Sequence, residues 1–248
     1  MSDAMTLAGR IAVITGGSRG IGSGIARALV AGGARVLITG RSASALDAAA
    51  RGIRNENSAA SDAIHVLRAD VRRPEEATAA IDAAVSRFGG LDILVNNAGV
   101  GHFATVAEMS VDDWQQILET NLSGAFYCSH AAIPHLKRRG GGWIINISSL
   151  AGNNPFAGGA AYCASKAGLN AFSEALMQEV RYDNIRVSYI MPGSVATDFG
   201  GSSSAGDADW KIAPEDVANL VTELVTFPSR SLPSRIELRP SKPKKAAK

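Results

Sequence analysis

Short apolar runs alternate with longer helix-compatible segments, and this alternation constrains the fold of the chain more than any other feature. The runs rich in β-branched residues are 10–15 (RIAVIT), 34–39 (ARVLIT), 64–69 (IHVLRA), 91–96 (LDILVN), 142–148 (GWIINIS), 185–190 (IRVSYI) and 236–238 (IEL). Runs that are almost continuously apolar are typical of strands buried on both faces, as in parallel sheets. The sequence therefore predicts a seven-stranded, mostly parallel sheet.

The segments between these runs are long enough for crossover helices. Helical patterns cover residues 21–31, 42–54, 74–88, 111–139, 162–182 and 214–226. A repeated strand–helix–strand order predicts an α/β chain with a doubly wound Rossmann fold and helices on both faces of the sheet. Because no Pro/Ser-rich linker interrupts the pattern, we expect one catalytic domain over residues 1–240. Residues 241–248 (SKPKKAAK) are expected to form a basic, flexible tail.

Charge and cysteine usage exclude several classes of partner. Twenty-five basic and 23 acidic residues leave a net charge of +2, which argues against charge-driven binding to nucleic acid or anionic membranes. Residues 1–9 carry no long apolar run, and the uncharged stretch 140–165 is broken by Gly, Asn and Pro, so neither a signal peptide nor a membrane span is expected. Cys128 and Cys163 match no metal spacing and are expected to be buried thiols. We expect a cytoplasmic protein without a metal.

A glycine-rich turn joins the first predicted strand to the first predicted helix. Its sequence is Thr15-Gly16-Gly17-Ser18-Arg19-Gly20-Ile21-Gly22. Backbone amides at such a turn, together with the positive helix N-terminus, can bind a pyrophosphate. The spacing differs from the standard Gly-x-Gly-x-x-Gly, and no Gly-Lys-Ser/Thr follows, which excludes a Walker loop. The position of this turn, between the first strand and the first helix, favours a dinucleotide-binding site. A tight turn that binds no ligand is the alternative.

Two arginines indicate which dinucleotide binds. An NAD site carries Asp or Glu at the end of the second strand, where this chain has Thr39-Gly40-Arg41-Ser42. Arg41 and Arg19 supply guanidinium groups, which suit a 2′-phosphate. The sequence therefore predicts NADP(H), although each arginine alone is compatible with a solvated surface position.

Four polar residues form a candidate catalytic group. Tyr162 and Lys166 are four apart on one helix face, where a lysine ammonium is expected to lower the tyrosine pKa. Ser149 follows the strand 142–148, although the adjacent Ser148 remains an alternative. Asn121 falls in the apolar stripe of its predicted helix, and a buried Asn needs hydrogen-bond partners. Its alternative role is a core residue that caps a backbone group.

Together these residues resemble the short-chain dehydrogenase/reductase family, from the first strand to about Thr197. The resemblance rests on the glycine turn, on Asn96-Asn97-Ala98-Gly99, on Asp70-Val71, on Pro192-Gly193 with Thr197, and on Asn121, Ser149, Tyr162 and Lys166. It implies an oxidoreductase that transfers hydride between NADP(H) and a carbonyl or secondary alcohol. The cofactor-binding residues that the motifs and the resemblance indicate are Gly16, Ser18, Arg19, Gly20, Ile21, Gly22, Arg41, Asp70, Val71, Asn97, Ala98, Gly99, Tyr162, Lys166, Pro192, Gly193, Val195 and Thr197.

The resemblance also implies roles for the catalytic residues. Tyr162 would donate the proton, Ser149 would orient the carbonyl, Lys166 would hold the ribose hydroxyls, and Asn121 would anchor a water that links Lys166 to solvent. Asp70 would accept from the adenine amino group. The family further implies a homo-oligomer on helices 111–139 and 162–182, with a tetramer favoured and a dimer as the alternative.

The substrate is the least determined feature. We expect specificity to come from loops 151–161 and 198–213, with Phe103, Phe156, Phe199 and Trp210 as an apolar wall and His102 near the mouth. Relatives with elaborate substrates often carry a longer helical insert at the second loop, so a 3-oxoacyl-acyl-carrier-protein reductase is the runner-up. A dinucleotide-sensing regulator is the alternative of another class, and the presence of Tyr162 argues against it.

Overall fold

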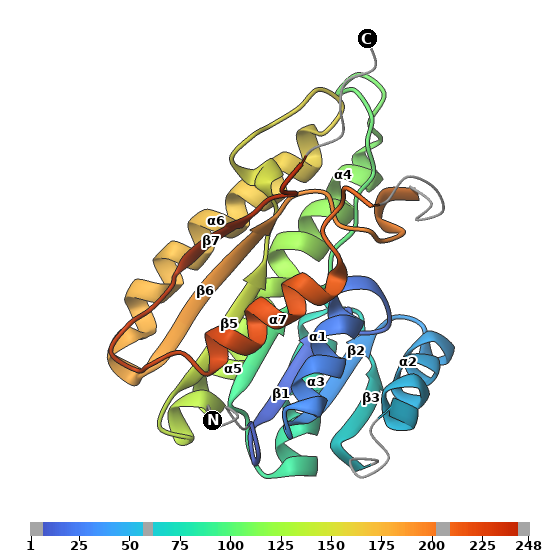
Figure 1. Ribbon diagram of the computed structural model, residues 1–248. Helices are drawn as coiled ribbons and strands as arrows, with labels where there is room; N and C mark the ends of the chain where they lie inside the picture. Colours follow the sequence, from blue (N-terminus) through green and yellow to red (C-terminus); the bar gives the residue numbers. More distant parts are fainter. Residues whose placement is uncertain (1–6, 57–61, 202–208, 243–248) are drawn as a thin grey trace.

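The computed structural model describes residues 7–56, 62–201 and 209–242, and a seven-stranded sheet forms its centre (Figure 1). The strand order is β3-β2-β1-β4-β5-β6-β7, and every neighbouring pair is parallel, which confirms the predicted architecture. The strands are β1 (Ile11–Thr15), β2 (Arg35–Gly40), β3 (Ile64–Arg68), β4 (Ile93–Asn96), β5 (Gly142–Ile147), β6 (Ile185–Pro192) and β7 (Arg235–Leu238).

Helices connect successive strands, and their bounds lie close to the predicted ranges. They are α1 (Gly20–Ala31), α2 (Ala43–Glu56), α3 (Pro74–Phe88), α4 (Val111–Leu118), α5 (Gly124–Arg138), α6 (Ala160–Val180) and α7 (Pro214–Val225). No helix within the described ranges combines the length and the apolar character needed to cross a membrane. Most of the predicted tail 241–248 and the middle of loop 198–213 lie outside the described residues.

The core consists of two apolar layers, one on each face of the sheet. Ile14 and Ile145 point to the layer that α1, α2 and α7 cover, while Val13 and Ile144 point to the layer under α3, α5 and α6. Alternate residues of a strand face opposite sides, so a strand buried on both faces must be apolar throughout. Figure 1 shows α1 and α7 in front of the sheet and α5 and α6 behind it.

The predicted helix over residues 111–139 is interrupted. Ser110 caps α4 by accepting a hydrogen bond from the Asp113 amide at 3.0 Å. A π-helical segment, Glu119–Ser123, then separates α4 from α5. Single π turns inside α-helices are rare and occur frequently at functional sites. This one carries Asn121, which is buried in the interior.

The sheet reverses its winding between β1 and β4, which are hydrogen-bonded neighbours although two strands separate them in sequence. Ligands of open α/β sheets bind at such a switch point, beyond the carboxyl ends of the strands. The glycine turn follows β1 and the Asn97-Ala98-Gly99 segment follows β4. Strand topology therefore brings these two segments to the same edge.

Candidate active site

A cavity of about 1180 Å³ opens at the carboxyl ends of the strands. That volume exceeds the ~300–1,000 Å³ of pockets for drug-sized ligands, so it can hold a larger molecule. The predicted residues that line it are Gly16, Ser18, Arg19, Gly20, Ile21, Arg41, Asp70, Val71, Asn97, Ala98, Gly99, Ser149, Tyr162, Lys166, Pro192, Gly193, Val195 and Thr197. Gly22 and Asn121 are not among the lining residues, and both are buried.

The glycine turn is packed tightly against the segment that follows β4. A Cβ atom on Gly22 would lie 2.4 Å from the Gly16 carbonyl oxygen, and one on Gly16 would lie 2.8 Å from the Ala98 Cα. The missing side chains at these two positions therefore make room for the protein's own backbone, not only for a ligand. Gly20 also has a φ of +55°, which favours glycine.

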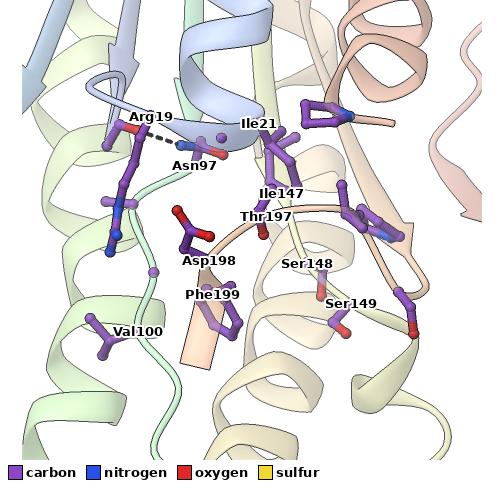
Figure 2. A pocket seen from close by; sticks show the side chains of 18 of the residues that line it. Arg19, Ile21, Asn97, Val100, Ile147, Ser148, Ser149, Thr197, Asp198 and Phe199 are labelled. Carbon is purple, nitrogen blue, oxygen red and sulfur yellow. Dashed lines mark hydrogen bonds between the residues drawn. The ribbon is translucent and has the colours of Figure 1, made fainter. Parts of the chain in front are cut away.

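Hydrogen bonds join this turn to the Asn97 segment. The Thr15 hydroxyl accepts from the amides of Asn97 and Ala98, each at 3.0 Å. In return, the Asn97 side-chain amide donates to the carbonyls of Thr15 and Gly16 at 2.9 and 3.0 Å, and Figure 2 shows Asn97 directly beside the turn. The Asn97 side chain thus braces the turn, while its position leaves it at the cavity wall.

Arginines surround one end of the cavity. Arg19 precedes the first turn of α1 and Arg41 follows β2, and both line the cavity. Asp70 follows β3, and its two carboxylate oxygens accept from the Arg72 guanidinium at 3.0, 3.0 and 2.6 Å. This hydrogen bonding lowers the pKa of Asp70, so its carboxylate is held ionised. Sequence reasoning missed Arg72, because an Arg two residues after an Asp is not a recognisable signal.

The two adjacent serines have different environments. The Ser148 hydroxyl is buried and donates to the Asn170 Oδ1 at 2.5 Å. The Ser149 hydroxyl accepts from the Ala151 amide at 3.1 Å and also forms a hydrogen bond with the Tyr162 side chain. Ser149 is therefore the serine beside the tyrosine. Figure 2 shows both serines below Ile147, at the opposite side of the cavity from Arg19.

Burial dominates the protonation of Tyr162 and Lys166. The Lys166 ammonium donates to the Ile147 carbonyl at 2.8 Å and lies 5.8 Å from the centroid of the Tyr162 ring. Burial lowers the pKa of Lys166 to about 8. Burial also raises the pKa of Tyr162, and the hydrogen bond with Ser149 opposes that rise. Lys166 is not among the groups that shift the Tyr162 pKa, so the expected lowering by the lysine is not found in this structure.

The Asn121 side chain is fully engaged by protein groups. Its Oδ1 accepts from the Val100 amide at 2.8 Å, and its Nδ2 donates to the Val100 carbonyl and the Ser165 hydroxyl, each at 3.0 Å. Ser165 in turn donates to the Tyr162 carbonyl at 2.7 Å. Asn121 therefore ties the segment after β4 to helix α6, which carries Tyr162 and Lys166. These contacts fit the alternative role of a core residue that holds a backbone segment.

A buried amide behind Ser149 was not identified from the sequence. Asn170 accepts from Ser148, and its Nδ2 donates to the Asn153 Oδ1 at 3.3 Å. The two partners flank Ser149 in sequence, so Asn170 holds both sides of the serine loop. No periodic signal distinguishes such an Asn from other polar residues of a long helix.

We expect Asn170→Ala to lower the free energy of unfolding by ~1–3 kcal/mol, because the buried Ser148 hydroxyl loses its short hydrogen bond and keeps only the Lys166 carbonyl, at 3.4 Å, as an acceptor. Thermal unfolding measures this as a Tm several degrees lower. Asn154→Ala is the matched control in the same loop, since Asn154 is exposed and bonds only the Leu150 carbonyl among the described contacts. Equal Tm values for the two variants would contradict the role of Asn170.

The substrate end of the cavity is aromatic. Phe103, Phe156, Phe199 and Trp210 all line the cavity, as the sequence predicted. His102 is not among the lining residues, and its Nδ1 lies 3.9 Å from an Asp113 carboxylate oxygen. Both cysteines are buried and unpaired, and no group of three potential metal ligands occurs in the described part of the chain.

Comparison with known proteins gives consistent matches over most of the chain. The sequence model of the family described as short chain dehydrogenase matches residues 10–208. An uncharacterised oxidoreductase of Staphylococcus saprophyticus is 33% identical over 235 residues, covering 93% of this chain and 97% of the relative. A short-chain type dehydrogenase/reductase of Picea abies is 39% identical over 235 residues, covering 89% of this chain and 87% of the relative.

Two solved structures are similar over nearly their whole length. The alcohol dehydrogenase of the archaeon Thermococcus sibiricus, complexed with 5-hydroxy-NADP, has a TM-score of 0.87 at 28% identity and covers 96% of this chain and 99% of that one. A metagenomic short-chain oxidoreductase in complex with NADP has a TM-score of 0.82 at 36% identity, with coverages of 95% and 99%.

Proposed function

The chain belongs to the short-chain dehydrogenase family of oxidoreductases, and on that premise we propose that it uses NADP(H) to interconvert a carbonyl compound and an alcohol. The observation that carries the proposal is the placement of Tyr162, Ser149 and Lys166 around one cavity whose other end holds Arg19 and Arg41. One end suits proton transfer to an oxygen atom, and the other suits a phosphate.

The residues of the cavity fit NADP(H). Its volume is large enough for a dinucleotide, and it begins at a helix N-terminus with a glycine turn, where a pyrophosphate is stabilised. The two arginines would hold the 2′-phosphate, and no carboxylate stands at the end of β2 to bind an unphosphorylated ribose. The NADP and 5-hydroxy-NADP complexes of the two structural relatives support this choice.

Each of the candidate catalytic residues would have a separate role in the reaction. When bound, NADPH supplies a hydride for the carbonyl carbon. Ser149 would donate a hydrogen bond to the carbonyl oxygen, and the Tyr162 hydroxyl would give its proton to the alkoxide that develops there. A raised tyrosine pKa keeps that proton in place before the reaction. Lys166 would hold the ribose hydroxyls, and Asn121 would position helix α6 through its hydrogen bond to Ser165.

A pH dependence follows from Lys166. Its pKa of about 8 means that it is charged below that pH and neutral above it. If the charge holds the ribose, kcat/KM for NADPH should be constant below about pH 8 and fall above it. Tyr162 contributes no fall in this range, because its pKa is raised. The Lys166→Met variant should have a low kcat/KM for NADPH that does not fall further above pH 8. The surface variant Lys137→Met should keep the wild-type pH profile.

Titration of Lys166 does not itself destabilise the folded protein in that range. The usual pKa of lysine is 10.5, so the unfolded chain binds the Lys166 proton more tightly than the folded protein does. Between about pH 8 and 10.5 this group therefore makes the folded state more stable as the pH rises. A profile that stays flat through pH 9 in the stable wild-type protein would contradict the role of the charged lysine.

The reaction itself is tested by following NADPH oxidation with aldehydes, ketones, diketones, quinones and ketoacyl thioesters. We expect turnover of ketones or aldehydes in the presence of NADPH. Turnover confined to ketoacyl thioesters would favour the acyl-carrier-protein reductase. Tight NADPH binding without oxidation by any of these classes would contradict the enzymatic proposal and favour a dinucleotide-sensing protein.

The helices α4, α5 and α6 are proposed to form a homo-oligomer interface. Exposed apolar side chains support this, because Val111, Trp114 and Phe126 are 70%, 39% and 48% exposed. Light scattering after size exclusion should give a tetramer, with a dimer as the alternative, and a monomer of 25.7 kDa would contradict the proposal.

A further inference from the structure

Two phenylalanine rings contact the Tyr162 ring, and a third phenylalanine contacts one of these two. Phe103 and Phe199 lie 5.7 and 5.6 Å from the Tyr162 ring, centroid to centroid, and Phe156 lies 5.7 Å from Phe103. Phe103 meets Tyr162 edge to face, with 77° between the ring planes. The residue that we propose as the proton donor therefore belongs to an aromatic cluster, defined here as Phe103, Phe156, Phe199 and Tyr162.

The phenylalanine rings are incompletely buried. Phe103, Phe156 and Phe199 are 44%, 48% and 36% exposed, and all three line the cavity. Leaving a large apolar surface in water is unfavourable by ~25 cal/mol per Å², so an apolar ligand that covers these rings is stabilised by their burial. Figure 2 shows Phe199 facing the cavity on the same side as Val100, with Ser149 across from it.

Small residues beneath the rings make room for them. A Cβ atom on Gly101 would lie 2.7 Å from Phe199, one on Gly200 would lie 2.8 Å from Phe103, and one on Gly159 would lie 2.5 Å from Phe156. Any other residue at these glycines would displace a ring. The cluster is therefore built into three segments of the backbone and does not depend on one flexible side chain.

We propose that the substrate carries a flat aromatic group near its carbonyl, and that Phe103 and Phe156 bind this group while Tyr162 protonates the oxygen. The proposal rests on the proposed function and narrows its substrate class. Aromatic rings have a negative face and a positive edge, so an aromatic ligand gains an attraction to the cluster beyond the area that it buries. A saturated ring of similar size lacks that additional attraction.

A matched pair of ketones tests this proposal. The substrates are 1-phenylpropan-2-one and 1-cyclohexylpropan-2-one, whose carbonyls are insulated from the ring by one methylene. We expect kcat/KM with NADPH to be about tenfold higher for the phenyl ketone. Phe103→Leu and Phe156→Leu should each reduce this ratio toward one. Phe227→Leu is the control, since Phe227 is 40% exposed and is not among the residues lining the cavity.

Binding of unreactive analogues separates this proposal from the reaction. Calorimetric titration of the NADPH-bound protein with 2-phenylacetamide and 2-cyclohexylacetamide should show tighter binding of the phenyl compound. Turnover of both ketones at the same kcat/KM, or a preference that both leucine variants retain, would overturn the aromatic assignment and leave the proposed function standing. If no carbonyl reacts, the proposed function fails. The titration still decides the aromatic site, and equal or absent binding of the two amides overturns it.

Discussion

Replacing Tyr162 with phenylalanine should reduce NADPH-dependent turnover by ~10²–10⁴-fold while leaving NADPH binding unchanged. The change removes one hydroxyl and keeps the ring, so the contacts with Phe103 and Phe199 persist. Without that hydroxyl, the developing alkoxide has no positioned proton donor, and Ser149 alone can only donate a hydrogen bond. Turnover is measured by NADPH absorbance with the best ketone, and the dissociation constant of NADPH by cofactor fluorescence.

Tyr182→Phe supplies the matched control for this substitution. Tyr182 is 92% exposed and lies outside the cavity, so its variant should retain wild-type turnover. Unchanged turnover in Tyr162→Phe would reject the proton-donor role. Loss of NADPH binding along with turnover would instead assign Tyr162 chiefly to the cofactor site.

Replacing Arg41 with serine should weaken NADPH binding by roughly 10- to 150-fold and leave NADH binding nearly unchanged. A charge-assisted hydrogen bond contributes ~1.5–3 kcal/mol, which corresponds to that range of dissociation constants. The effect is confined to NADPH because only this dinucleotide carries the 2′-phosphate that Arg41 would contact. Arg19→Ser should act in the same direction, since Arg19 lines the same end of the cavity. Fluorescence titration with both cofactors measures the effect.

A third arginine tests whether general surface charge explains the result. Arg51 lies exposed on α2, the helix that follows Arg41, and does not line the cavity. Arg51→Ser should therefore bind NADPH like the wild-type protein. The NADP(H) assignment would be contradicted if Arg41→Ser weakened the binding of NADPH and NADH equally. A clear preference of the unmodified protein for NADH would contradict it as well.

The fold could be predicted closely because its signals are local. A strand buried on both faces must be apolar along its whole length, and a crossover helix must carry a continuous helical pattern. The interruption of the helix 111–139 could not be predicted in this way. One π turn changes the helical repeat over five residues only, Glu119–Ser123, which is too short to alter the apolar periodicity.

The candidate residues were also accessible from the sequence, but their environments were not. Ser148 and Ser149 have the same chemistry and adjacent positions, and only the approach of Asn170 to one and Tyr162 to the other distinguishes them. Likewise, the spacing of Tyr162 and Lys166 indicates that they share a helix face. It does not reveal that burial raises one pKa and lowers the other.

The sequence by itself determined the doubly wound sheet and the glycine turn, because each depends on residues close together in the chain, and its motifs indicated the candidate catalytic residues. Only the tertiary structure decided that Phe103 and Phe199 contact Tyr162, that Phe156 contacts Phe103, and that Asn121 and Asn170 brace the catalytic segments. These contacts join residues from different helices and loops. Their distances are set by how the sheet and helices pack, which no local pattern in the sequence encodes.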